Sequence, residues 1–145
     1  MTHNKYITRV ILNSTAVIAL LLGTLLYILF RENAYFSIWV SDLVPLDGVR
    51  SAFSFADCGF LKYYLADYLW ALSLASWLTL ILEKIWAKYY CFAAFCITSC
   101  FGGVFELLQY SDLISGTGDP LDLVLYLSAG LTVNVITFLI RSKEK

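Results

Sequence analysis

The sequence predicts an all-α integral membrane protein, a bundle of four transmembrane helices with an interfacial segment between the first two. Of its 145 residues, 60% are hydrophobic and only 14% are charged, and the mean hydropathy is +0.75. Soluble domains are usually about 45–50% apolar and about 25% charged, so this is the composition of a membrane protein. Four apolar runs also reach the roughly 20 residues that a helix needs to cross a bilayer.

The first predicted span covers about residues 8–30, and its apolar part from Val10 to Phe30 follows Lys5 and Arg9. A basic start before an apolar run also occurs in signal peptides, whose apolar core has about 7–15 residues. This run is longer, and no cleavage site of small residues follows it. We therefore expect a retained helix.

The connection over residues 31–60 is long but not polar. Its segment AYFSIWVSDLV is rich in aromatic and aliphatic residues such as Trp39, which suits a segment lying in the membrane interface. Pro45, Asp47 and Gly48 then favour a turn. We expect this connection to cap the bundle, because long connections in compact domains are seldom free loops.

The remaining apolar runs cover about residues 61–82, 89–110 and 121–140. No internal repeat and no low-complexity segment interrupts them. Residues 1–145 are therefore expected to form one membrane domain.

The distribution of basic residues predicts the orientation, because Lys and Arg near transmembrane helices are retained on the cytoplasmic side. In a four-helix arrangement one side holds seven of them: Lys5, Arg9, Lys84, Lys88, Arg141, Lys143 and Lys145. The other side holds Arg31, Arg50 and Lys62, offset by Glu32, Asp42, Asp47 and Asp57. We expect a multi-pass membrane protein with both termini in the cytoplasm.

Composition also argues against two classes of function. The net charge of −1 does not favour a nucleic-acid partner. The only histidine is His3, and the cysteines form no CxxC pair, so a zinc site is not expected. Cys91, Cys96 and Cys100 are expected to be small apolar residues inside one span.

Four acidic residues gather near the predicted outer ends of the helices: Asp67, Glu106, Asp119 and Asp122. At 1.5 Å per residue, Asp67 and Glu106 lie at a similar depth, roughly 6–9 Å below the interface, and neither opens a predicted helix. A charged side chain at the bilayer centre costs about 2.5–3.5 kcal/mol, and less near the interface. Both should therefore face inward, toward water, a cation, each other or a ligand.

The segment GDPLD, residues 118–122, has the pattern of a helix start. Asp119 suits the N-cap, Pro120 the first helical position and Asp122 the third, where acids accept hydrogen bonds from free backbone N–H groups. For Asp119, a cap and a functional carboxylate are equally open interpretations.

Helical spacing predicts three inward-facing rows of residues. They are Thr98, Gly102, Glu106 and Gln109; Asp122, Tyr126, Gly130 and Asn134; and Asp67, Trp70 and Leu74. Close packing of small and polar residues explains Gly102, Gly130 and Asn134 but not Glu106. We therefore predict a ligand-binding site from Asp67, Trp70, Glu106, Gln109, Asp119, Asp122 and Tyr126.

These motifs resemble the VanZ-like family of small bacterial membrane proteins over about residues 60–135. The likeness consists of E-x-x-Q at Glu106, a short loop with a glycine, and D-x-x-D at Asp119; D-x-x-W at Asp67 is similar to a motif of small relatives. The family commonly has arginine where this chain has Gly116, and asparagine where it has Tyr126. The resemblance implies a bacterial envelope protein that lies in the bacterial cytoplasmic membrane, and one member of the family is associated with reduced sensitivity to a glycopeptide antibiotic.

Three functions are compatible with these patterns. The first is a membrane protein whose acidic outer pocket recognises a lipid head group, a cationic amphiphile or a lipid-linked envelope ligand. The second is an enzyme in which the carboxylates hold Mg²⁺ or Ca²⁺ and act on a lipid-linked phosphate, since both ions prefer oxygen ligands. The third is a structural or partner-binding subunit. Membrane lipids are partners in each case, and the oligomeric state is left open.

Overall fold

The fold is known from a computed structural model, which describes residues 3–31, 35–52, 59–60, 64–86, 88–114 and 118–142. Its long helices are α1 (His3–Phe30), α5 (Leu65–Ile85), α6 (Tyr90–Tyr110) and α7 (Pro120–Ser142). All four are long and apolar enough to cross a membrane. The predicted all-α fold with four membrane-spanning helices is confirmed.

The helix boundaries differ from the prediction by a few residues at several ends. Helix α1 begins at His3 and α7 continues to Ser142, so both extend past their apolar runs into charged sequence. Helix α5 begins at Leu65, with Tyr64 as its N-cap residue, and continues to Ile85. The predicted start of this span, residues 61–63, lies outside the described residues.

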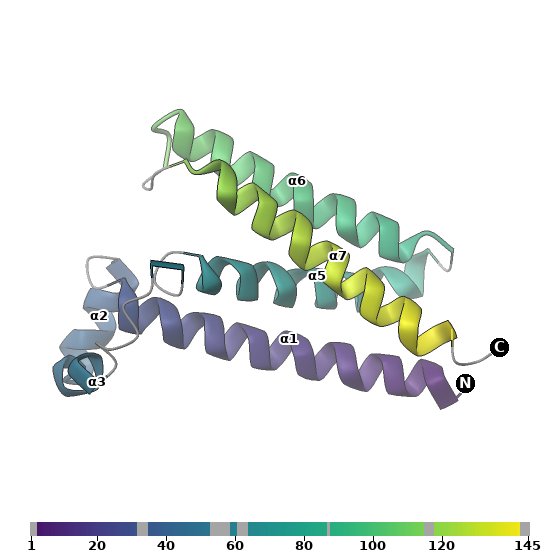
Figure 1. The fold of residues 1–145 in the computed structure, drawn as a ribbon, viewed down its shortest axis with the longest axis horizontal. Coiled ribbons are helices and arrows are strands. Elements are labelled where there is room, and N and C mark those ends of the chain that lie inside the picture. Colours follow the sequence, from purple (N-terminus) through teal and green to yellow (C-terminus); the bar gives the residue numbers. More distant parts are fainter. Residues whose placement is uncertain are drawn as a thin grey trace.

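The long helices form two pairs that share α5 as a common neighbour (Figure 1). Helix α1 packs mainly against α5, while α6 and α7 pack against each other and both contact α5. The ends of α1 and α7 that carry the chain termini lie at the same end of the bundle (Figure 1).

Small residues form much of the buried core. Ala16 of α1, Ala71 and Ala75 of α5, and Ala129 of α7 are at most 1% exposed. Among lipid tails the hydrophobic effect does not drive helices together, so close packing of small side chains and polar contacts between helices take its place. Leucine, phenylalanine and valine side chains are instead prominent among the exposed residues, as expected where lipid surrounds the bundle.

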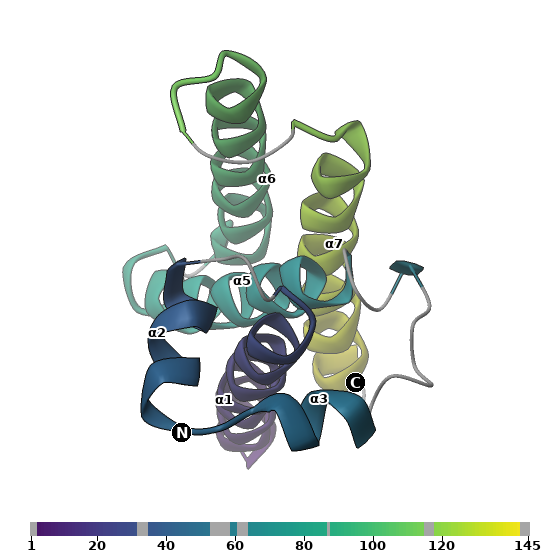
Figure 2. The same cartoon turned by 90° about the vertical axis from the view of Figure 1, so that its left-hand side faces the viewer.

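The connection after α1 contains two short helices, α2 (Tyr35–Leu43) and α3 (Asp47–Ala52), which lie across one end of α1 (Figure 2). Arg50 donates hydrogen bonds to the Ile28 carbonyl at 3.0 Å and to Ser37 Oγ at 2.7 Å. The fully buried Ser37 donates to the same carbonyl at 3.0 Å. Carbonyls in the last turn of a helix lack a helical partner, so these bonds complete the end of α1.

The predicted turn in this connection is only partly correct. The chain is not helical at Pro45, but Asp47 and Gly48 belong to the first turn of α3. An acid in the first turn of a helix is stabilised by the exposed N–H groups there, which explains why Asp47 starts a helix. Trp39 and Leu43 of α2 are 60% and 65% exposed, which suits contact with lipid.

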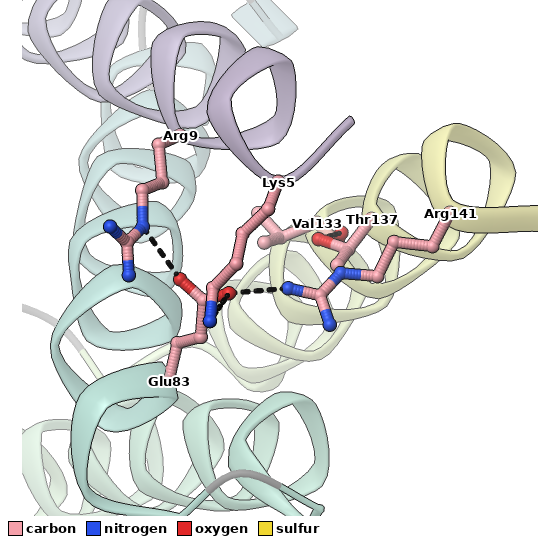
Figure 3. A network of polar contacts seen from close by, with 6 residues as sticks. All are labelled: Lys5, Arg9, Glu83, Val133, Thr137 and Arg141. Carbon is pink, nitrogen blue, oxygen red and sulfur yellow. Dashed lines mark hydrogen bonds and ion pairs between the residues drawn. The ribbon is translucent and has the colours of Figure 1, made fainter. Parts of the chain in front are cut away.

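At the end of the bundle near the chain termini, one carboxylate holds three cations (Figure 3). Glu83 accepts a hydrogen bond from Arg9 Nε at 3.0 Å and one from Arg141 Nη2, and Lys5 Nζ lies 3.7 Å from its Oε1. The Glu83 side chain is only 6% exposed. This Glu83 cluster (Lys5, Arg9, Glu83, Arg141) joins α1, α5 and α7. We call this end, which also carries Lys84 and Lys88, the basic end.

We expect Glu83→Gln to destabilise the protein by about 3 kcal/mol, because removing one partner of a buried ion pair leaves the other charges uncompensated. Thermal unfolding in a neutral detergent measures the effect. Lys84→Gln is the matched control, since Lys84 is exposed and has no ion pair among the described residues. Equal melting temperatures for the two variants would contradict a structural role for the cluster.

Candidate functional site

The four acids of the predicted site lie at the end of the bundle opposite the Glu83 cluster. Asp67 is in the first turn of α5 and Asp122 in the first turn of α7. Glu106 lies in the last turns of α6, and Asp119 directly precedes α7. Asp122 lies within electrostatic range of Asp67, Glu106 and Asp119. We call this the acidic end.

The expected position of Asp67 along its helix needs correction. A span that begins at about residue 61 places Asp67 six residues inside it, but α5 starts at Leu65, so Asp67 lies within the first turn. The positive N-terminal end of the helix stabilises a carboxylate there. Part of the cost of placing Asp67 in the membrane is therefore offset by the helix itself.

Asp67 has a direct cationic partner that the sequence analysis did not assign. Arg31, the residue after α1, places Nη2 2.8 Å from Asp67 Oδ2, and the Asp67 side chain is 16% exposed. The Arg31 guanidinium also lies 5.4 Å from the ring centre of Tyr27. The VanZ-like pattern has an arginine in the loop before α7; here an arginine at the end of α1 contacts the carboxylate.

Trp70, predicted as a ligand residue, is placed against α1. Its Nε1 donates to Thr24 Oγ1 at 3.3 Å, and its ring centre lies 4.9 Å from that of Tyr27. A Cβ atom on Gly23 would lie only 2.8 Å from Trp70 Cδ1, so this glycine makes room for the indole. These contacts are those of a residue that packs α1 against α5.

Asp119 is the N-cap of α7, and it also joins three segments. Its Oδ1 accepts from the Leu121 N–H at 2.9 Å and its Oδ2 from the Tyr64 hydroxyl at 2.8 Å. Its own N–H donates to Glu106 Oε2 at 2.7 Å. The Leu121 N–H and then the Tyr64 hydroxyl lower the pKa of Asp119, and the bond to Asp119 raises the pKa of Tyr64. Both Asp119 oxygens are thus bound to other parts of the protein.

The sequence analysis missed Tyr64. Its hydroxyl is the link between the start of α5 and the start of α7. The only sequence signal is its place in KYYLAD, just before the first acid of the second span. An aromatic residue at that place suits the membrane interface equally well, so the pairing with Asp119 is not visible without the fold.

Asp122 and Gln109 have polar atoms that are buried and unsatisfied. Asp122 Oδ1 and Gln109 Oε1 have no hydrogen-bond partner within the part of the chain that the structure describes. A carboxylate only accepts hydrogen bonds, and leaving a buried acceptor without a donor costs about 1–3 kcal/mol. These two oxygen atoms could each accept a hydrogen bond from a ligand at the acidic end.

The predicted inward rows on α6 and α7 face each other in the structure. Thr98 and Gly102 are buried, and Gly102 packs directly against the ring of Tyr126. Gly130 is buried against Phe95. Tyr126 therefore lies between the helices, next to the acidic residues with which it interacts electrostatically.

No group of three or more histidine, cysteine or acidic side chains within the described ranges could hold a metal ion. Binding of Mg²⁺ or Ca²⁺ stays a prediction from the sequence. Gly116, which marks the departure from the VanZ-like pattern, lies outside the described residues.

Comparison of the chain with family models, with curated proteins and with solved structures finds no match. The resemblance to the VanZ-like family also stays a prediction, carried by the short motifs alone. The function therefore has to be inferred from the geometry of the acidic end.

We expect Gly102→Ala to destabilise the protein by about 1–3 kcal/mol, because its added methyl group would collide with Tyr126 and overpack a close helix contact. Gly103→Ala is the matched control, since the nearest atom to a Cβ there is Leu123 Cδ1 at 3.8 Å. Thermal unfolding of both variants in detergent tests this. A Gly102→Ala variant as stable as Gly103→Ala would show that α6 and α7 do not pack through this contact.

Proposed function

We propose that the protein is a small membrane protein of the bacterial envelope that binds the cationic head group of an amphiphile at its acidic end. The ligand class is an ammonium group with N–H donors, carried on an apolar chain that stays in the bilayer. The acceptor atoms of Asp122 and Gln109 would receive its hydrogen bonds. Tyr126 would lie beside the bound group.

The charge balance of the acidic end favours a cation. Four carboxylates gather there, and Arg31 forms an ion pair with one of them, Asp67. Arg50, the other basic residue described near this end, donates to Ile28 and Ser37. Carboxylates that share a site resist simultaneous ionisation unless a cation joins them.

The observation that carries the proposal is the buried Asp122 Oδ1, which has no hydrogen-bond donor among the described residues. The other carboxylates can be explained by the fold: Asp67 by Arg31, Asp119 by its cap and Tyr64, and Glu106 by the Asp119 N–H. No such contact within the described residues accounts for the buried acceptor atoms of Asp122 and Gln109. Residues that need an external donor, beside an excess of negative charge, match an ammonium ligand better than an anionic one.

The position of the site favours a ligand that enters from the membrane. The four acids lie at one end of helices that are otherwise apolar on their outer faces, such as Val124 and Leu127 on α7. An amphiphile can place its head group at this level while its chain remains among lipid tails. A ligand fully dissolved in water would not need this arrangement.

The orientation of the chain is tested by labelling. The basic end carries five cations and one carboxylate within the described residues, so we infer that it faces the cytoplasm and that the acidic end faces outward. In a chain whose native cysteines are replaced by alanine, an impermeant maleimide added to whole cells should label an Asp112→Cys variant and spare a Lys88→Cys variant. The reverse pattern would contradict the outward placement.

Ligand recognition is tested by titration in a neutral detergent. Dodecylammonium should bind more tightly than dodecyltrimethylammonium, because the second has the same charge sign and chain but no N–H donor. Asp122→Asn should weaken dodecylammonium binding by about tenfold to a hundredfold, as expected for loss of a hydrogen bond to a charged group. Calorimetry or the shift in melting temperature measures both effects.

Asp112→Asn is the matched control for this titration. Asp112 lies in the exposed turn after α6 and has a positive φ of 55°, which asparagine also adopts. Equal binding of the two amphiphiles, or an equal loss in both variants, would contradict the proposal. Stabilisation by Mg²⁺ that disappears in Asp122→Asn would favour the metal-dependent function instead.

A further inference from the structure

A separate feature at the basic end points to a second ligand. An open cavity of about 600 Å³ lies where α5 turns into α6, and its lining residues are Trp86, Lys88, Tyr89, Phe92, Ala93 and Cys96. Its volume falls within the range of about 300–1,000 Å³ that is usual for small-molecule sites. None of these residues belongs to the acidic end.

The cavity extends from the turn between α5 and α6 along the start of α6. Lys88, Tyr89 and Trp86 lie in the turn between two membrane-length helices, where the head groups of the bilayer are expected. Phe92, Ala93 and Cys96 follow on the first turns of α6, and at 1.5 Å per residue Cys96 is about 9 Å along the helix from Tyr90. The cavity is thus lined almost wholly by apolar atoms, and Lys88 supplies the one cationic side chain among its lining residues.

The charge of Lys88 has no acidic partner within the described residues. The Lys88 ammonium lies 5.3 Å from the ring centre of Tyr89, and no acidic side chain of the described residues pairs with it. Lys84, one turn earlier, is equally exposed. The nearby Glu83 cluster adds three cations that share one carboxylate, so the whole end attracts anions.

We propose that this cavity binds an anionic glycerophospholipid, with the phosphate beside Lys88 and an acyl chain along Phe92, Ala93 and Cys96. The apolar lining suits an acyl chain, and Lys88, an exposed lining residue, supplies a cation for the head group. A zwitterionic lipid would bring its own cation close to Lys88. A preference for net negative lipids follows from that difference.

The test uses the full chain in a neutral detergent and phospholipids with brominated acyl chains, which quench nearby tryptophans. The signal from the cavity is the quenching of the wild type minus that of Trp86→Phe, because the chain has four tryptophans. Brominated phosphatidylglycerol should give this signal at lower concentration than brominated phosphatidylcholine. Excess unlabelled phosphatidylglycerol should remove it.

Two lysine variants separate a site from diffuse attraction. Lys88→Gln should weaken phosphatidylglycerol binding by about fivefold, the effect expected for one basic residue at an anionic lipid surface. Lys84→Gln makes the same charge change outside the cavity and should weaken it less than twofold. Both residues are exposed, so both variants are expected to fold.

Three results would overturn the proposal. They are equal signals from the two lipids, equal losses in the two lysine variants, and quenching that Trp86→Phe leaves unchanged. A chain that instead forms a dimer, dissociated by Phe92→Ala and with Trp86 unquenched by either lipid, would assign the cavity to self-association and also reject lipid binding.

Discussion

Every charged group that enters the bundle has to find a partner, because lipid offers none, and the Glu83 cluster shows the strongest form of this constraint. Glu83 of α5 is nearly fully buried and meets Arg9 of α1 and Arg141 of α7. Long helices are stiff, so fixing them at one end also limits where their other ends lie. The opposite ends of α1 and α7 are where Arg31 and Asp122 reach the acidic residues.

Some acidic-end residues stabilise the fold through contacts within the protein, and others have polar atoms that could bind a ligand. Asp119 uses both oxygens for Leu121 and Tyr64, and its N–H binds Glu106. These bonds favour the cap interpretation of Asp119. The proposed ligand contacts are therefore assigned mainly to Asp122 and Gln109. The polar groups of a membrane bundle can therefore not be counted together as one site; each must be followed to its partner.

The two ends of the molecule have opposite charge and different construction. At the basic end, cations of α1 and α7 surround one carboxylate of α5, and Lys88 lines an apolar cavity. At the acidic end, the described residues include more acids than cations. The two proposals therefore assign opposite head-group preferences to the two ends, since each end would attract the lipid or amphiphile that lowers its own excess charge.

The sequence determined what depends on local pattern. Hydropathy located the four spans, the order of residues in GDPLD identified the Asp119 cap, and the repeat of four along α6 put Thr98 and Gly102 in the interior. These features follow from helix geometry and from backbone N–H groups only one or two residues away. They need no knowledge of neighbouring helices.

Only the tertiary structure decided which polar residues meet. The pairs Arg31–Asp67, Tyr64–Asp119 and Arg9–Glu83 are separated by 36, 55 and 74 residues, and no short motif encodes them. The packing of Trp70 against Gly23 is likewise a property of the assembled bundle, as is the lack of a donor for Asp122 Oδ1 among the described residues. An apolar run predicts that a helix crosses the membrane. Which side of that helix faces the interior, and which helix it packs against, depend on close packing with the other helices, which the run itself does not specify.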